Sequence, residues 1–250
     1  MHKFANPTQF MRIANAIYPW AAGICFLLFA AALPVALVFS PPDYQQGETV
    51  RIMYVHVSSA WLMLMIYGII AVNSAMFLIW RHPMANLVAR ASAPVGATFC
   101  ALALITGMLW GRPMWGAFWV WDARLTSTLI LFFLYLGYIA LADAFEDSER
   151  GDKAAAVLAL VGSVNIPIIH FSVEWWNTLH QPSIIKTSSA GIESSVHGSI
   201  LLPLFLMMGA FTMFYVALLV VRLRSELLAA KIRNARLSQI AGQTAAQPAE

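Results

Sequence analysis

Aromatic and charged side chains that could bind a ligand are concentrated in one short segment, residues 110–127. This segment reads W-G-R-P-M-W-G-A-F-W-V-W-D-A-R-L-T-S and holds four tryptophans, two arginines and one aspartate. Long apolar runs precede and follow it, so we expect a short connection between two helices. A connection of this length has no folding requirement for four indoles, whereas their flat apolar faces would bind a large planar ligand.

Histidines supply groups that could bind a metal atom in such a ligand. His56 lies in the sequence Y-V-H-V-S-S-A-W, and His180 follows the sequence W-W-N-T-L. Two neutral imidazoles on opposite faces of a macrocycle form an axial pair for haem iron. Zinc would need three or four ligands, and neither H-x-x-x-H nor H-x-x-E-H occurs in the chain. The residues therefore predict haem, although a histidine bonded to a backbone carbonyl remains the alternative for each position, and His170 and His197 receive no role.

The charged residues of the tryptophan segment have two interpretations. Asp122 and Arg124 could order the loop, with the arginine pairing with the carboxylate or capping a helix. Alternatively, Arg124 or Arg112 could bind an anionic group of the ligand, since arginine suits bidentate recognition of carboxylates. Both interpretations are open for the arginines, and we expect Asp122 to order the loop.

The elements that position these residues are predicted to be membrane-spanning helices. The chain has 250 residues, of which 60% are apolar and 11% charged, whereas soluble domains have about 25% charged residues. Apolar runs long enough to cross a bilayer occur at 18–39, 52–80, 91–110, 125–144, 154–171 and 196–221. We therefore predict an all-α, polytopic membrane protein whose six helices form one domain, residues 1–221, with short loops.

Basic residues are distributed unevenly between the two sides of this predicted bundle. One side holds eleven of the fifteen lysines and arginines: Lys3, Arg12, Arg81, Arg90, Arg150, Lys153, Arg222, Arg224, Lys231, Arg233 and Arg236. The bias predicts that both termini are cytoplasmic. It also explains the isoelectric point of about 9.0 without nucleic acid as a partner. Residues 222–250 are predicted to be a cytoplasmic amphipathic tail, which could lie on the lipid bilayer or on a partner, or could be a solvated extension of the last helix.

Tryptophans are distributed in the opposite sense. Only Trp20 and Trp80 are expected near the cytoplasmic face, whereas an interfacial aromatic belt would place similar numbers at both faces. The other seven are expected toward the outer face: Trp61, Trp110, Trp115, Trp119, Trp121, Trp175 and Trp176. This imbalance favours a ligand-binding surface on the outer side.

These residues resemble a known family. The sequence W-G-x-x-W-x-W-D-x-R-L-T-S, at residues 115–127, resembles the tryptophan-rich (WWD) signature of haem-handling proteins of cytochrome c maturation. The length and the six spans are similar to the CcmC family, and the resemblance extends over all but the last ten residues. It implies that His56 and His180 are axial ligands of haem b. The tryptophans that would pack on the haem are Trp115, Trp119, Trp121, Trp61, Trp175 and Trp176.

The resemblance also implies a function and partners. The protein would bind haem at the periplasmic face of the bacterial inner membrane and deliver it to the haem chaperone CcmE. It would do so with the CcmA ATPase, the CcmB membrane subunit and the small CcmD protein, as an ABC-type complex. ATP hydrolysis would occur on a partner, so the chain itself would not be an enzyme.

Two other functions compete with haem delivery. The first is a b-type cytochrome or quinol-linked electron-transfer subunit, in which paired histidines usually face each other inside the bundle core. The expected position of His180 in a loop disfavours such a permanently buried haem. The second is a permease for an amphipathic solute, which would need polar groups near the bilayer midplane, where only Asn73 and Asn165 are modest candidates.

Overall fold

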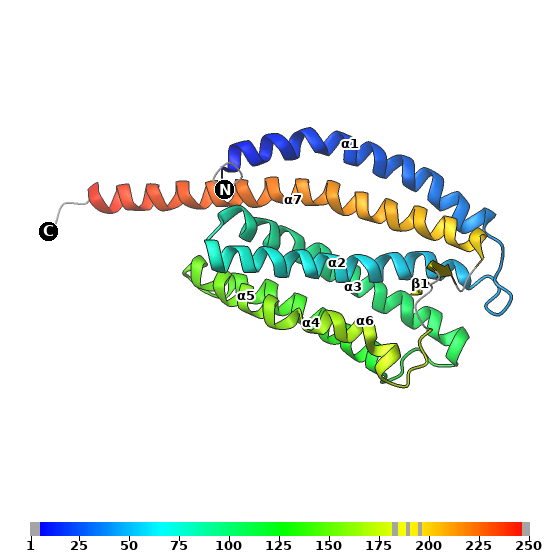
Figure 1. Cartoon of the computed structure of the whole chain (residues 1–250). Helices are drawn as coiled ribbons and strands as arrows, with labels where there is room; N and C mark the ends of the chain where they lie inside the picture. The colour runs from blue at the N-terminus through cyan, green and yellow to red at the C-terminus, as the bar shows by residue number, and fades with distance from the viewer. Residues whose placement is uncertain (1–5, 182–184, 189–190, 195–196, 247–250) are drawn as a thin grey trace.

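The computed structural model describes residues 6–181, 185–188, 191–194 and 197–246. These residues form a bundle of long helices, and six helical segments are long and apolar enough to cross a membrane (Figure 1). The elements are α1 (Pro7–Pro34), the π-helical turn η2 (Val35–Phe39), α2 (Val50–Trp80), α3 (Pro83–Trp115), α4 (Ala123–Asp143), α5 (Ser148–Gly162), α6 (Asn165–Trp175), β1 (Ile185–Ser188), β2 (Gly191–Ser194) and α7 (Gly198–Ala246). The predicted all-α membrane bundle with six spans is confirmed.

The helices around the tryptophan segment are longer than the sequence predicted. α3 continues to Trp115 instead of ending near residue 110, and α4 begins at Ala123. Gly116 ends α3 in a left-handed conformation, with φ of 77°, which glycine adopts without steric cost. The non-helical connection is therefore limited to residues 116–122, and the rest of the segment 110–127 is helical.

The last two predicted spans also differ from the observed helices. The run 154–171 is divided between α5 and α6, because Pro167 has no N–H to bond to the carbonyl of Ser163. α7 does not end at residue 221 but continues without a break to Ala246. The predicted tail is thus a helical extension of the last span as far as the structure describes it.

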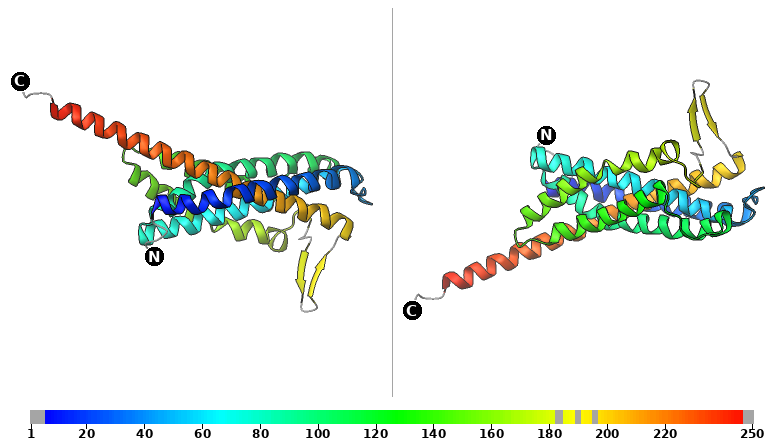
Figure 2. Two further views of the ribbon diagram at one scale, coloured as in Figure 1. Left: turned by 90° about the horizontal axis from the view of Figure 1, so that it is seen from above. Right: turned by 90° about the horizontal axis from the view of Figure 1, so that it is seen from below.

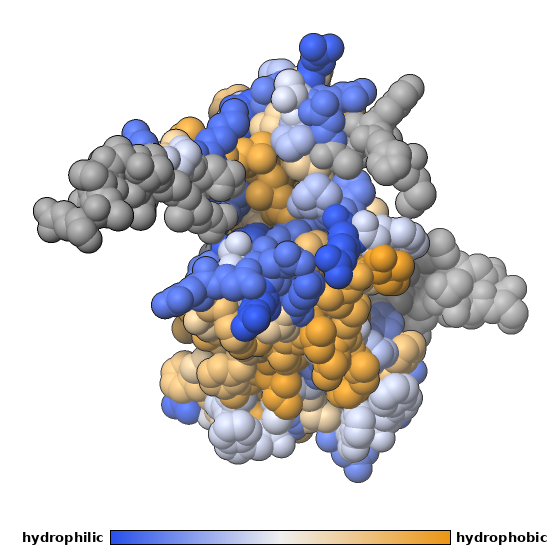
Figure 3. All heavy atoms as spheres, turned by 90° about the vertical axis from the view of Figure 1, so that its left-hand side faces the viewer, coloured by the Kyte–Doolittle hydropathy of each residue, from blue (hydrophilic) through white to orange (hydrophobic). Residues whose placement is uncertain are grey.

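The bundle has two distinct ends. α1 begins at the end where α7 projects, which we call the proximal end, and Figure 1 shows that both chain termini lie there. The opposite, distal end holds the connections 40–49, 116–122 and 176–181. Seen from the proximal end, hydrophilic residues are grouped above a hydrophobic flank (Figure 3). That this end is cytoplasmic stays a prediction from the distribution of basic residues.

A two-stranded antiparallel sheet lies in the distal connection between α6 and α7. Ile185 of β1 is opposite Ser194 of β2. Figure 2 shows the hairpin projecting sideways from the helices. The sequence analysis did not predict these strands.

Small residues allow α2, α3 and α4 to pack closely below the distal end. A Cβ atom on Gly96 of α3 would collide with the ring of Tyr135 on α4. The hydroxyl of Tyr135 donates a hydrogen bond of 2.6 Å to the carbonyl of Met63 on α2. This contact holds three helices in register, and small residues at such positions let membrane helices approach each other.

Candidate functional site: a histidine pair in a tryptophan-lined cavity

A cavity of about 340 Å³ opens at the distal end between α2, α3, α4, α6 and α7. Most of the side chains that line it are apolar, and its size and lining are typical of small-molecule sites. The chemistry-bearing residues that line it are His56, Trp61, Trp110, Trp115, Trp119, Arg124, His170, Glu174 and His180. The structure therefore brings both predicted ligand histidines to one cavity, with three of the predicted tryptophans.

His56 is held rigidly in the second turn of α2. Its side chain is only 9% exposed, and its Nδ1 lies 3.0 Å from the carbonyl oxygen of Ala103 on α3. A carbonyl oxygen can only accept, so Nδ1 must donate and Nε2 carries no proton. The hydroxyl of Thr106, 3.2 Å from Nδ1, donates to the carbonyl of Leu102 and adds a second acceptor. His56 thus presents the neutral tautomer whose Nε2 can bind a metal.

Gly107 on α3 leaves the space that the His56 ring occupies. A Cβ atom added there would lie 3.0 Å from Cε1 of His56. Replacing Gly107 with valine is therefore expected to displace the imidazole and weaken haem binding by about 10- to 100-fold, as for other changes that misorient a metal ligand. Haem titration of the purified protein measures this. Gly68→Val on α2 is the matched control, because nothing lies within 4 Å of that position. If the Gly107→Val and Gly68→Val variants bind haem with equal affinity, the assignment of His56 as a haem ligand is wrong.

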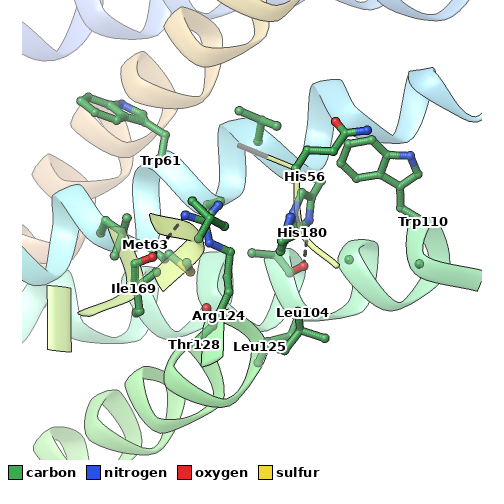
Figure 4. Close-up of a pocket in the computed structure, with 18 of the residues that line it drawn as sticks. His56, Trp61, Met63, Leu104, Trp110, Arg124, Leu125, Thr128, Ile169 and His180 are labelled. Carbon is green, nitrogen blue, oxygen red and sulfur yellow. Dashed lines mark hydrogen bonds between the residues drawn. The ribbon is translucent and has the colours of Figure 1, made fainter. Parts of the chain in front are cut away.

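His180 lies on the distal connection, facing His56. The centroids of the two rings are 6.1 Å apart and their planes differ by 25° (Figure 4). Histidine binds metals at about 2 Å, and each nitrogen is about 1 Å from its ring centroid, so one metal atom between two imidazoles separates the centroids by about 6 Å. The observed separation leaves room for one metal atom, which the stacked rings would bind with their nitrogens turned toward it.

The electrostatics of the cavity keep His180 neutral. Burial, which has the largest effect, the nearby charge of Arg124 and the interaction with His56 together lower the pKa of His180 to about 3. At neutral pH the ring therefore has an unprotonated nitrogen available to bind a metal. In the part of the chain that the structure describes, no group of three or more histidine, cysteine, aspartate or glutamate side chains could hold a metal ion. The pair is thus a two-ligand arrangement.

The tryptophans divide into those that line the cavity and those that do not. Trp61, Trp115 and Trp119 line it, and the ring centroids of Trp115 and His180 are 5.5 Å apart in an edge-to-face arrangement. The Nε1 of Trp119 is buried without a hydrogen-bond partner among the described residues. A buried N–H without a partner is costly, so this donor is available to a bound ligand.

Three tryptophans predicted to pack on the ligand lie elsewhere. Trp121 is 77% exposed and rests against Trp119, while Trp175 stacks on Phe171 at 5.3 Å. Neither they nor Trp176 are among the residues that line the cavity. Their positions at the exposed distal surface are those of an interfacial aromatic belt.

Asp122 connects the tryptophan segment to the connection that carries His180. Its Oδ1 accepts a hydrogen bond of 2.7 Å from the N–H of Leu125 and so caps α4. Its Oδ2 accepts from the hydroxyl of Thr178, whose Oγ1 in turn accepts from the N–H of His180 at 3.0 Å. The carboxylate therefore caps α4 and is linked through Thr178 to the backbone of His180, a candidate metal ligand.

Arg124 both supports α6 and charges the cavity. Its Nη2 donates to the carbonyls of Ile169 and His170, and its Nε donates to the hydroxyl of Ser172. These bonds connect the start of α4 to the middle of α6. Its Nη1 makes no hydrogen bond with any residue that the structure describes, so it can still meet an anionic ligand group.

Arg112 lies outside the cavity, on the last turn of α3. It donates to the carbonyl of Gly116 at 2.8 Å, and its guanidinium lies over the ring of Phe118. This geometry supports the loop-ordering interpretation of Arg112. His197 also lies outside the lining, with Nδ1 2.9 Å from the hydroxyl of Ser199.

The cavity is also lined by residues that the sequence did not assign to haem. Trp110 lines the cavity, and its Nε1 donates to Oε1 of Gln46 in the first distal connection at 3.0 Å. Ala103, Gly107, Trp110, Gly111 and Met114 recur at helical spacing along α3. Extending the face of Trp110 along α3 in both directions, in steps of three and four residues, predicts Ala103, Gly107 and Met114. His170 and Glu174 on α6, four residues apart, also line the cavity.

Comparison with known proteins agrees with the motif. The family profile described as CcmC, Heme exporter protein C, matches residues 1–238. A Heme exporter protein C of Bradyrhizobium diazoefficiens is 48% identical over 94% of this chain and 88% of its own length. The Heme exporter protein C of Haemophilus influenzae is 46% identical over 91% and 92%, respectively. A putative cytochrome c biosynthesis ccmC-like mitochondrial protein of Marchantia polymorpha is 48% identical over 76% and 78%. The chain belongs to the heme exporter protein C family.

Proposed function

We propose that the distal cavity binds haem b, transiently and without a covalent bond, with His56 and His180 as axial ligands. The observation that carries this proposal is the pair of imidazole rings, 6.1 Å apart and nearly parallel, in a cavity lined by four indoles. Through its family, the chain serves haem export in cytochrome c biogenesis, as a transport subunit and not as an enzyme. What haem supplies is an iron with two axial positions for the histidines.

The remaining residues of the cavity match other parts of a haem molecule. Trp115 and Trp119 offer flat apolar surface to the macrocycle. Nη1 of Arg124 and the unpartnered Nε1–H of Trp119 are the donors that can meet the propionate carboxylates. We assign Arg112 and Asp122 to ordering the loop between α3 and α4.

We further propose that the chain delivers this haem to the periplasmic chaperone CcmE, at the outer face of the bacterial inner membrane. The ATP-hydrolysing partner would be CcmA, assembled with CcmB and CcmD. The position of the cavity supports delivery, since it opens at the distal end, opposite the predicted cytoplasmic side. The attachment of His180 to a loop supports it too, because an axial ligand that can move away suits transfer better than the fixed pair of an electron carrier.

Haem transfer from the purified protein to the chaperone tests this function. The haem-loaded protein, assembled with its ATPase and membrane partners in vesicles, is mixed with the soluble domain of the apo-chaperone and ATP. We expect haem to appear covalently attached to the chaperone after separation by denaturing electrophoresis. The His56→Ala variant, loaded with the same total haem, is the control and is expected to transfer none. Haem that stays with the wild-type protein and cycles between oxidation states would instead favour the electron carrier.

A further inference from the structure

A second cavity, of about 490 Å³, lies on the flank of the bundle and has no part in the haem site. It is a groove between α1 and α3, with α7 as its floor. α1 packs mainly on α7, alongside which it runs in Figure 1. The groove is lined by Phe29, Pro94, Val95, Thr98, Phe99, Leu102, Phe211, Phe214, Leu218 and Arg222.

The groove is apolar at one end and cationic at the other. Phe29, Phe99, Phe211 and Phe214 pack together at its inner end, with ring centroids between 5.6 and 6.4 Å apart. Arg222 is the charged residue of the lining and lies eleven residues beyond Phe211, toward the proximal end.

The length of the groove matches one leaflet of a bilayer. Eleven residues of α-helix, at about 1.5 Å each, separate Phe211 from Arg222 by about 16 Å. Half of the hydrocarbon core of a bilayer is about 15 Å thick. The phenylalanine cluster therefore lies at the depth of the bilayer midplane when Arg222 lies at the level of the headgroups in the leaflet on the proximal side.

The guanidinium of Arg222 has a donor to spare. Its Nε is buried and has no hydrogen-bond partner among the described residues. Its Nη2 lies 3.5 Å from Glu226, one turn further along α7, in a partly exposed pair that contributes little. A buried N–H without a partner at the end of an apolar groove is a site for an anionic oxygen.

We propose that this groove binds one anionic phospholipid from the leaflet on the proximal side. An acyl chain lies along α7 down to the phenylalanine cluster, and the phosphate accepts a hydrogen bond from Arg222. Basic pockets between membrane helices bind anionic headgroups in this way. The bound lipid fills the groove between α1 and α3.

Native mass spectrometry of the full-length, detergent-solubilised protein tests the proposal. The protein is mixed with equal amounts of phosphatidylglycerol and phosphatidylcholine that carry the same acyl chains. We expect one phosphatidylglycerol to be retained in preference to phosphatidylcholine by about fivefold, the effect of one basic side chain on an anionic headgroup. Arg222→Gln is expected to remove this preference and Glu226→Gln to increase it. Equal retention of the two lipids by the wild-type protein would overturn the proposal.

Two further variants separate the groove from general effects. Arg224→Gln is the matched control, because Arg224 bonds to Asn15 and lies over the ring of Tyr18, outside the groove. It is expected to leave lipid retention unchanged. Thr98→Trp places an indole in the groove and is expected to reduce retention of both lipids. A Thr98→Cys variant is tested in intact membranes, where its thiol is expected to react with a lipid-soluble thiol reagent. If it forms a cross-link to another protein instead, a partner helix occupies the groove and the proposal is wrong.

Discussion

Replacing His56 with alanine is expected to weaken haem binding by at least about 100-fold, because loss of a hydrogen bond that merely orients a metal ligand already costs about 10- to 100-fold. The His56 ring is buried. Its Nδ1 lies within hydrogen-bond distance of the carbonyl of Ala103 and the hydroxyl of Thr106 on α3, and Gly107 leaves the space that the ring occupies. The substitution removes the axial ligand that the bundle itself positions. Titration of the purified variant with haem, followed in the Soret region, measures the loss.

Two further histidine variants control this experiment. His180→Ala is also expected to lose the wild-type spectrum, but added imidazole should restore it more readily, because His180 is on a connection and is only partly buried. His197→Ala removes a distal histidine that bonds to Ser199 outside the cavity, and it should bind haem normally. If His197→Ala fails as completely as His56→Ala, the loss reflects damage to the fold and not the loss of a ligand.

Replacing Asp122 with alanine is expected to have the second largest effect on haem binding, a loss of about tenfold or more. The change removes the N-cap of α4, which contributes about 1 kcal/mol to helix stability. It also removes the acceptor for Thr178, whose Oγ1 holds the backbone of His180. The His180 ring should then be less well positioned while the helices stay folded, so haem affinity should fall far more than the temperature of unfolding.

A double-mutant cycle separates the two functions of Asp122. Thr178→Val breaks the connection to His180 but leaves the α4 cap intact. If Asp122 acts on the site through Thr178, the double variant should bind haem little worse than Asp122→Ala alone, because residues in one hydrogen-bond network are not additive. Additive losses, or a Thr178→Val variant with normal affinity, would show that the carboxylate acts only as a helix cap.

The sequence was sufficient to predict the number of spans and the histidine pair. Long apolar runs indicate membrane helices directly, because the backbone N–H and C=O groups in lipid must form hydrogen bonds within each helix. The choice of His56 and His180 among the outer-face histidines came from the resemblance of their sequence contexts to those of a known family. That the two rings share one cavity depends on the packing of α2 against α3 and on the course of the connection after α6, and no local pattern contains that information.

The tryptophans show where local reasoning fails. Trp119 and Trp121 are two residues apart in the same connection, yet one lines the cavity and the other is exposed. Trp175 is near His180 in the chain, but its ring stacks on the ring of Phe171, which belongs to the same helix, α6. Gly107 was not identified, because a glycine reveals its function only when the neighbouring helix places a side chain against it.

The electron paramagnetic resonance spectrum of the haem-loaded ferric protein tests the central claim most directly. If His56 and His180 bind the iron from opposite sides, the wild-type protein should give a low-spin, six-coordinate spectrum, and each single alanine variant should give a high-spin one. Restoring the low-spin spectrum with imidazole in the His180→Ala variant would complete the assignment. A wild-type protein that binds haem in a high-spin state, or a low-spin spectrum that survives both substitutions, would contradict the account.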